Sequence, residues 1–391
     1  ELLELKQILI SLLESGLIEP SNSPYSAGVL LVPNPNGKWR LVTDYRKINA
    51  ITIKSKYPLP RIDDIFSKVQ GATCFSVLDC ADGFWQLRIA PEDCHKTAFA
   101  TPFGHYQFKV AAMGLCNSPA SFQMLMNHIF RPVMGTARLP QVSRDLRDPT
   151  VKHASYPAPA YKRTCVAVYL DDILVYSLSF SDHLEDLAAV LAIMQDNQLS
   201  ARRAKVRSGR SVPFLGHVLS DTGIATDPSK IASVQSWPVP SSVSQVRSFL
   251  GIASYYRRFI PRFATLAAPI NNLLRKDVAW EWTATCQHAF ETLKDRLLTA
   301  PILKLPDTSR PFIVASDASK VAIGGVLMQE YEGILHPVEY ISRTMIAAER
   351  NYPVHQQEML AVVYCCHAWR HLLLGAKFDV SINHPQDTDP Y

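Results

Sequence analysis

The sequence predicts an α+β protein of more than one domain. With 391 residues, the chain is too long for one ordinary hydrophobic core, so two or three domains are expected. Hydrophobic residues make up 47% and charged residues 19% of the chain, both within the range of globular proteins. Segments with strand periodicity and segments with helix periodicity both occur, so the domains should combine sheets with helices.

The overall composition restricts the class of protein. There are 40 Lys and Arg residues against 35 Asp and Glu, a net charge of +5 that permits a polyanionic partner without showing one. The eight cysteines form neither a CxxC pair nor a zinc-ligand spacing, so reduced intracellular thiols are expected. The sequence contains no run of about 18 apolar residues, so no membrane span is expected, and no signal peptide is recognisable. The chain starts at Glu1 within a helical pattern, which indicates a fragment of a longer protein.

Helices and strands are both predicted in the first third of the chain. A turn rich in Pro, Asn and Gly joins the first two strands, and Ser118-Pro119 is a favourable helix start. The predicted helices are 2–14 and 118–134, and the predicted strands are 28–32, 39–43 and 75–79.

Residues 136–163 interrupt this pattern. They contain four prolines and many charges, and they show no periodicity. A long segment without structure is unusual inside a compact domain. It is either a tolerated surface loop or translated non-coding sequence from a faulty gene prediction.

Strand character resumes at Cys165, and helices and strands continue to the end. A capping-box spacing opens the helix at Ser242, and Gly375 ends the last helix. The predicted helices are 182–196, 242–258 and 354–374, and strands are predicted from 311 to about 342 and again over 377–382.

The strongest local feature is a pair of acids between two apolar strands. Asp171 and Asp172 lie in the middle of the segment 166–176 and would sit at the tip of a hairpin. They could simply form the turn. They could also form half of a divalent-metal site, because a cation removes the repulsion between adjacent carboxylates. Asp79, at the end of its own strand, could complete a site for two Mg²⁺ ions.

Motifs along nearly the whole chain resemble the reverse transcriptase of gypsy-class (Metaviridae) LTR retrotransposon Pol polyproteins. In chain order they are GLIEPSNSPYSAGVLLV, WRLVTDYRKIN, KYPLPRIDDIF, FSVLDCADGFWQLRI, KTAFATPFGHYQF, MGLCNSPASFQ, YLDDILVYS and FLGH. The resemblance implies a right-hand polymerase of fingers, palm and thumb, followed by an RNase H-like α/β domain that is truncated at its C-terminus. The implied limits are 1–220 for fingers and palm, 221–279 for the thumb or connection, and 280–391 for the RNase H-like domain.

The resemblance also implies roles for single residues. Asp79, Asp171 and Asp172 match the catalytic ligands of two Mg²⁺ or Mn²⁺ ions. The residues that match the nucleotide-binding positions are Arg40, Phe84, Met113, Gln123 and Lys205. Each has an alternative: Arg40 could be a solvated charge, Phe84 a core residue, and Gln123 part of the helix start.

Two further segments match nucleic-acid contacts of the family. Phe214, Leu215 and Gly216 match the primer-grip turn, although an ordinary β-turn is the alternative. Four arginines lie among aromatic residues and are similar to a helical nucleic-acid grip: Arg247, Arg257, Arg258 and Arg262. The basic run 202–210 is either a solvated face or a contact with primer–template phosphates. These matches imply RNA and DNA primer–templates and dNTPs as partners.

The second active site departs from the family pattern. Asp317, at the end of a strand, and Glu358, which is expected to open the long helix, match two of the family's four metal-binding nuclease carboxylates. The third position is Asn383, and the sequence stops before the fourth. Weak or absent cleavage of RNA–DNA hybrids is therefore expected.

These observations predict an RNA-directed DNA polymerase that is normally part of a polyprotein with protease and integrase. The intact acids favour this enzyme. Other features instead favour a degenerate or co-opted remnant that binds nucleic acid without catalysis: the insertion, Asn34 and Asn36 where the family usually has lysines in the fingers, Asn383 and the truncation. A metal-binding α/β protein unrelated to nucleic acids does not explain the ordered motifs. The expected location is the cytoplasm within a retroelement particle, or the nucleus.

Overall fold

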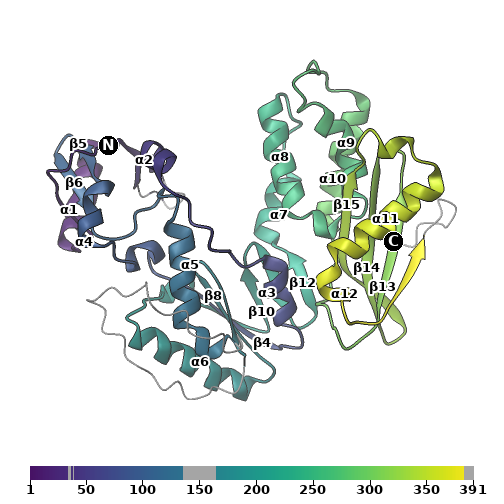
Figure 1. The fold of residues 1–391 in the computed structure, drawn as a ribbon, viewed down its shortest axis with the longest axis horizontal. Coiled ribbons are helices and arrows are strands. Elements are labelled where there is room, and N and C mark those ends of the chain that lie inside the picture. The colour runs from purple at the N-terminus through teal and green to yellow at the C-terminus, as the bar shows by residue number, and fades with distance from the viewer. Residues whose placement is uncertain (34–36, 38, 135–163, 383–391) are drawn as a thin grey trace. The chain divides into compact units, whose positions relative to one another are not determined.

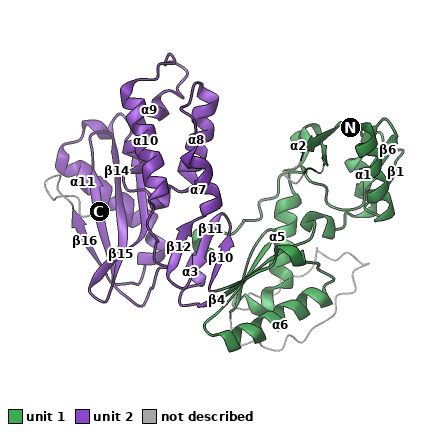
Figure 2. Cartoon of the chain, turned by 180° about the vertical axis from the view of Figure 1, so that it is seen from behind, with its two compact units in different colours: residues 1–65, 74–209 green, residues 66–73, 210–391 purple. Residues whose placement is uncertain are grey.

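The computed structural model describes residues 1–33, 37, 39–134 and 164–382 (Figure 1). The predicted insertion 136–163 and Asn383 lie outside these residues. The chain forms two compact units, residues 1–65 with 74–209 and residues 66–73 with 210–391 (Figure 2). The predicted domain limits divide the chain at other places and stay predictions. Within the described residues, no helix combines the length and apolar character needed to cross a bilayer.

The N-terminal part of the first unit packs small sheets against one helix. Leu5, Leu9 and Leu12 recur at helical spacing and are buried on one side of α1, where they meet Phe99 and Phe108. The strand pairs are β2 with β3, and β1 and β5 on either side of β6. The elements are α1 (Leu2–Glu14), β1 (Ile18–Pro20), β2 (Val29–Pro33), β3 (Trp39–Thr43), α2 (Arg46–Ile51), α4 (Pro91–Cys94), β5 (Phe99–Thr101) and β6 (Gly104–Phe108).

The remainder of the first unit is built on a four-stranded sheet in the order β7-β8-β4-β9. The inner strands are apolar on both faces, and buried residues of α5 and α6 pack against them. The elements are β4 (Cys74–Asp79), α5 (Ser118–Ile129), β7 (Val166–Tyr169), β8 (Asp172–Ser177), α6 (Phe180–Asp196) and β9 (Arg207–Gly209). Helix α3 (Ile62–Lys68) contributes its last residues to the second unit.

The second unit begins with a three-stranded sheet and a group of helices. Ser242 caps α8, because its hydroxyl accepts a hydrogen bond from the backbone N–H of Gln245 at 3.3 Å, as the capping-box spacing predicted. The elements are β10 (Ser211–Phe214), β11 (His217–Ser220), β12 (Gly223–Thr226), α7 (Pro228–Gln235), α8 (Val243–Tyr255), α9 (Phe263–Asn272) and α10 (Ala284–Leu298).

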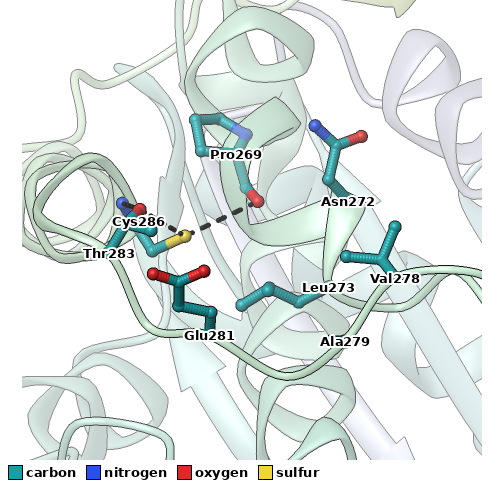
Figure 3. A pocket seen from close by; sticks show the side chains of 8 residues that line it. All are labelled: Pro269, Asn272, Leu273, Val278, Ala279, Glu281, Thr283 and Cys286. Atoms are coloured by element: carbon teal, nitrogen blue, oxygen red, sulfur yellow. Dashed lines mark hydrogen bonds between the residues drawn. The ribbon is translucent and has the colours of Figure 1, made fainter.

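Helices α9 and α10 pack against each other and leave an open hollow at one end of their contact (Figure 3). The thiol of Cys286 in α10 donates to the carbonyl oxygen of Pro269 in α9 at 3.7 Å. Pro269 lacks a backbone N–H, but its carbonyl remains available for this contact between the helices. The hollow gathers no group of catalytic side chains.

The C-terminal sheet of the second unit has the order β15-β14-β13-β16, with β16 parallel to β13. Helix α11 packs on one face through Ala361 and Cys365. The elements are β13 (Phe312–Ala318), β14 (Ala322–Tyr331), β15 (Ile334–Thr344), α11 (Val354–Ala368), α12 (Arg370–Leu373) and β16 (Phe378–Ile382). The predicted helix 354–374 is thus interrupted at Trp369.

One expectation about α11 is wrong. Glu358 does not open this helix, because α11 begins at Val354 and has no acid in its first turn. Pro353 fixes the start of the helix, since a proline ring favours the backbone geometry of a helix entrance. The predicted start of the helix at residue 354 is thus correct, and Glu358 lies one turn into the helix.

Candidate functional site

Three carboxylates meet where two strands of the first unit end. Asp79 is the last residue of β4 and Asp172 the first of β8, and the antiparallel register places them directly opposite each other. Asp171 lies in the turn before β8, and its carbonyl oxygen accepts a hydrogen bond from Cys80 N–H at 2.9 Å. The fold therefore brings Asp79 close to the paired acids, although it is more than 90 positions away from them in the sequence.

Burial and mutual repulsion shift the pKa values of the paired acids. Burial raises the pKa of Asp171 to about 6, and the neighbouring carboxylates of Asp172 and Asp79 add to the shift. Burial and Asp79 also raise the pKa of Asp172. One carboxylate oxygen of Asp171 is buried without a hydrogen-bond partner. An ionised acid in this position is costly until a cation or a donor reaches it.

Cations of the basic run lie beside Asp79. The Nζ atom of Lys205 is 2.9 Å from one carboxylate oxygen of Asp79, and Nε of Arg202 is 4.0 Å from the other. Arg202 also forms an ion pair with Asp82. Two members of the basic run are thus in contact with acids of the site, and the predicted contact of Lys205 with the nucleotide stays a prediction.

Gln123 holds the turn that carries the paired acids. Its side chain is completely buried, and its carbonyl oxygen accepts the N–H of Leu170 at 2.7 Å. Its amide nitrogen donates to the carbonyl oxygen of Val168 at 3.2 Å and to Asn127 at 2.9 Å. Leu170 has a left-handed backbone, with φ of 50°, which is uncommon for a residue other than glycine. Gln123 thus supports the hairpin turn, and its predicted place in the template and nucleotide pocket stays a prediction.

Gly83 and Phe84 form the wall next to Asp171. A Cβ atom on Gly83 would lie only 2.2 Å from Oδ1 of Asp171, so the carboxylate packs directly against the bare Cα. Phe84 is half-buried and makes an edge-to-face contact with Phe122, with ring centroids 5.7 Å apart. This position is compatible with the predicted sugar gate, but it is equally that of a ring at the edge of the core.

Arg40 and Met113 lie together on the first unit. Arg40 belongs to β3 and is exposed, and its guanidinium contacts the sulfur of Met113. Sequence matching assigned both to nucleotide binding, and the fold brings them together although they are 73 positions apart.

The predicted primer-grip turn connects β10 and β11 in the second unit. Leu215 and Gly216 both have positive φ, 46° and 67°, as in the two-residue turns that join tightly twisted strands. Their carbonyl oxygens accept hydrogen bonds from the hydroxyl groups of Tyr255 and Tyr256, with a distance of 2.6 Å to Gly216. Phe214 is buried below the turn.

The two arginines predicted as a nucleic-acid grip follow α8 in a short 3₁₀ turn, Arg257–Phe259. Arg257 is exposed, whereas Arg258 is half-buried with its guanidinium over the ring of Phe66 at 5.6 Å. Arg257 is thus the more accessible of the two, and the contact of both with nucleic acid stays a prediction.

The predicted nuclease acids belong to the C-terminal sheet and its helix. Asp317 lies near the end of β13, and Glu358 lies in α11. Nε of Arg262 is 2.8 Å from a carboxylate oxygen of Asp317. The sequence analysis placed Arg262 in the nucleic-acid grip, and no motif indicated its contact with Asp317, which is 55 positions away in the chain.

No metal site is preformed in the described ranges, where no three His, Cys, Asp or Glu side chains converge closely enough to hold an ion. The chemistry of the first unit's acids nevertheless suits a divalent cation. Asp171 offers a buried oxygen without a partner, and carboxylate oxygens are the ligands that Mg²⁺ prefers.

Comparisons with known proteins agree with this geometry. Residues 32–219 match the family "Reverse transcriptase (RNA-dependent DNA polymerase)", and residues 282–380 match "RNase H-like domain found in reverse transcriptase". The chain is 36% identical over 390 residues to the "Retrovirus-related Pol polyprotein from transposon 297" of Drosophila melanogaster. This alignment covers 98% of the chain and 34% of that relative. It is 35% identical over 363 residues to the "Transposon Tf2-3 polyprotein" of Schizosaccharomyces pombe, covering 92% of the chain and 25% of the relative. The chain thus spans about a third or less of the length of these relatives.

Solved structures support the fold. The foamy viral protease-reverse transcriptase dRH in complex with double-stranded DNA superposes with a TM-score of 0.81 at 22% identity, covering 97% of this chain and 62% of that one. The foamy viral protease-reverse transcriptase in complex with an RNA/DNA hybrid gives a TM-score of 0.78, covering 97% and 47%. The predicted α+β fold class is confirmed. The chain belongs to the reverse transcriptase family of transposon Pol polyproteins, with a reverse transcriptase domain followed by an RNase H-like domain.

Proposed function

We propose that this chain is an RNA-directed DNA polymerase that adds dNTPs to the 3′-hydroxyl of a primer on an RNA or DNA template. The observation that carries the proposal is the meeting of Asp79, Asp171 and Asp172 at the ends of β4 and β8. Divalent ions, two Mg²⁺ or Mn²⁺ per site, would activate the hydroxyl and neutralise the departing pyrophosphate. Asp171 is the acid best suited to receive such a charge, because its buried oxygen lacks a partner.

The protein's own groups would position the substrates. Gly83 lets the Asp171 carboxylate approach the backbone beside Phe84, whose ring is the candidate for excluding a 2′-hydroxyl. Arg40 offers a planar guanidinium suited to triphosphate oxygens, and Lys205 offers a second cation next to Asp79. The turn Phe214–Gly216 and Arg257 would contact the primer–template. The family resemblance further suggests the protease and integrase of a polyprotein as partners, with a cytoplasmic particle or the nucleus as the location.

We also propose that hybrid cleavage by the RNase H-like domain is impaired. Two of the family's nuclease acids are recognisable as Asp317 and Glu358, and the third position is Asn383. An amide keeps an oxygen ligand but loses its charge, which weakens the binding of a divalent cation.

Primer extension on poly(rA)·oligo(dT) with Mg²⁺ or Mn²⁺ tests the polymerase proposal. Asp171→Asn should lower the rate by roughly 10³-fold, because removal of a central electrostatic group costs about 4 kcal/mol at the transition state. Asp196→Asn is the matched control, since it makes the same change at an exposed acid at the end of α6. If neither the unmodified chain nor the control extends primers, the chain is a remnant that binds nucleic acid without catalysis. Equal extension by Asp171→Asn and the control would contradict the two-metal site.

A further inference from the structure

The start of α9 lies on one face of the C-terminal sheet. Asp317, Gly324 and Ser342 face one another across β13, β14 and β15, so their side-chain positions form one row on the same face. Arg262 Nε is 2.8 Å from Oδ2 of Asp317, and the backbone N–H of Ala264 donates to Oγ of Ser342 at 2.9 Å. Both ends of the row therefore contact the first residues of α9.

The opposite face of the sheet belongs to α11. Gly325 is the neighbour of Gly324 and points the other way, and a Cβ atom on it would lie 2.7 Å from Sγ of Cys365 in α11. Glu358 lies in the same helix. Asp317 therefore lies on the face of the sheet that contacts α9. Helix α11, which contains Glu358, packs on the opposite face.

Arg262 occupies a backbone position that does not favour arginine. Its φ of 52° lies in the left-handed region, where glycine or asparagine costs less. The ion pair with Asp317 offsets the cost of this backbone conformation. The Asp317 side chain is largely buried, with 22% of its surface exposed. Thr265, one turn into α9, adds a hydroxyl contact to Ser319 at 3.3 Å. Several contacts thus join this turn to the end of β13.

We propose that Asp317 is a structural anchor for α9 in this chain, with Arg262 as its resident counter-ion, and that it is not a metal ligand. Two observations support this assignment: a guanidinium already supplies a positive charge beside Asp317, and Glu358 belongs to the helix that packs on the other face of the sheet. The inference rests on the proposed function only in taking Asp317 as the former nuclease acid.

Thermal unfolding of the full chain tests the anchor without any polymerase activity. Asp171→Asn and Asp172→Asn form the background, so that the polymerase acids do not contribute a response to metal. In that background, Arg262→Gln and Asp317→Asn should each lower the Tm by about 1–3 °C, the range for a partly exposed ion pair in a domain of this size. The double variant should show no larger decrease than either single variant, because both remove one shared contact. Adding Mn²⁺ should leave the Tm of the background and of all three variants unchanged.

Two control variants sharpen the outcome. Arg275→Gln removes an exposed ion pair with Asp277 at 3.0 Å and should leave the Tm unchanged. Arg262→Lys keeps a positive charge and should retain more of the Tm than Arg262→Gln. Additive losses in the double variant would overturn the shared anchor. An increase in Tm with Mn²⁺ that Asp317→Asn abolishes would show that Asp317 is a metal ligand, whether or not the chain extends primers.

Discussion

Gln123→Leu tests whether the buried amide positions the paired acids. Leucine has a similar volume but cannot accept the N–H of Leu170, so that part-buried donor loses its partner. A donor left without a partner costs about 1–3 kcal/mol, and the lost contacts to Val168 and Asn127 act in the same direction. The added apolar surface against the core offsets some of this cost, leaving a net loss of about 2 kcal/mol.

The expected readouts follow from that magnitude. A loss of about 2 kcal/mol lowers the Tm by about 4–8 °C in a unit of roughly 200 residues. Because Leu170 precedes Asp171, release of the turn also shifts the acids, and a displacement of about 1 Å can reduce kcat by roughly 10²-fold. Calorimetry and single-turnover primer extension measure the two effects. Gln195→Leu is the matched control, since it places the same side chain on the exposed surface of α6 in the same unit.

A different pattern would refute this account of Gln123. If the substitution raises the KM for dNTPs while Tm and kcat stay within about twofold of the control's values, Gln123 contacts the nucleotide as the sequence match assigned it. Unchanged Tm, kcat and KM would show that the turn needs no support from Gln123.

Three further predictions concern metal, sugar selection and the insertion. Because the pKa of Asp171 in the folded protein is raised to about 6, the folded state binds more protons than the unfolded state between about pH 4 and 6, and its stability should fall as the pH rises through this window. Mg²⁺ should restore the stability above about pH 6. A stability that calorimetry finds constant across this window would contradict the raised pKa. Phe84→Ala should allow the incorporation of ribonucleotides and retain part of the incorporation of dNTPs. An unchanged selectivity between ribo- and deoxynucleotides would show that Phe84 is a core residue. Replacing residues 136–163 with a short Gly-Ser linker should preserve folding and activity, because the flanking segments are already in contact: Cys165 N–H donates to the Val133 carbonyl oxygen at 3.0 Å. Unfolding of this variant would show that the fold needs the segment.

Most secondary structure followed from local patterns. The helices α1 and α6 and the strands β3 and β4 lie within one or two residues of the predicted ranges, because apolar periodicity and capping residues act over short distances. The end of the last helix was less predictable. Trp369 ends α11 before Gly375 through tertiary packing in the core, which no local signal reports.

The sequence by itself determined the family, the α+β class and the identity of the paired acids, because ordered motifs and the flanking apolar strands are local properties of the chain. Only the tertiary structure decided which groups surround those acids. Gln123 reaches the hairpin turn, Lys205 reaches Asp79 and Arg262 reaches Asp317 across separations that no motif spans. Strand register and helix packing set these contacts, and both depend on long-range burial of the core, so they emerge only when the whole chain folds.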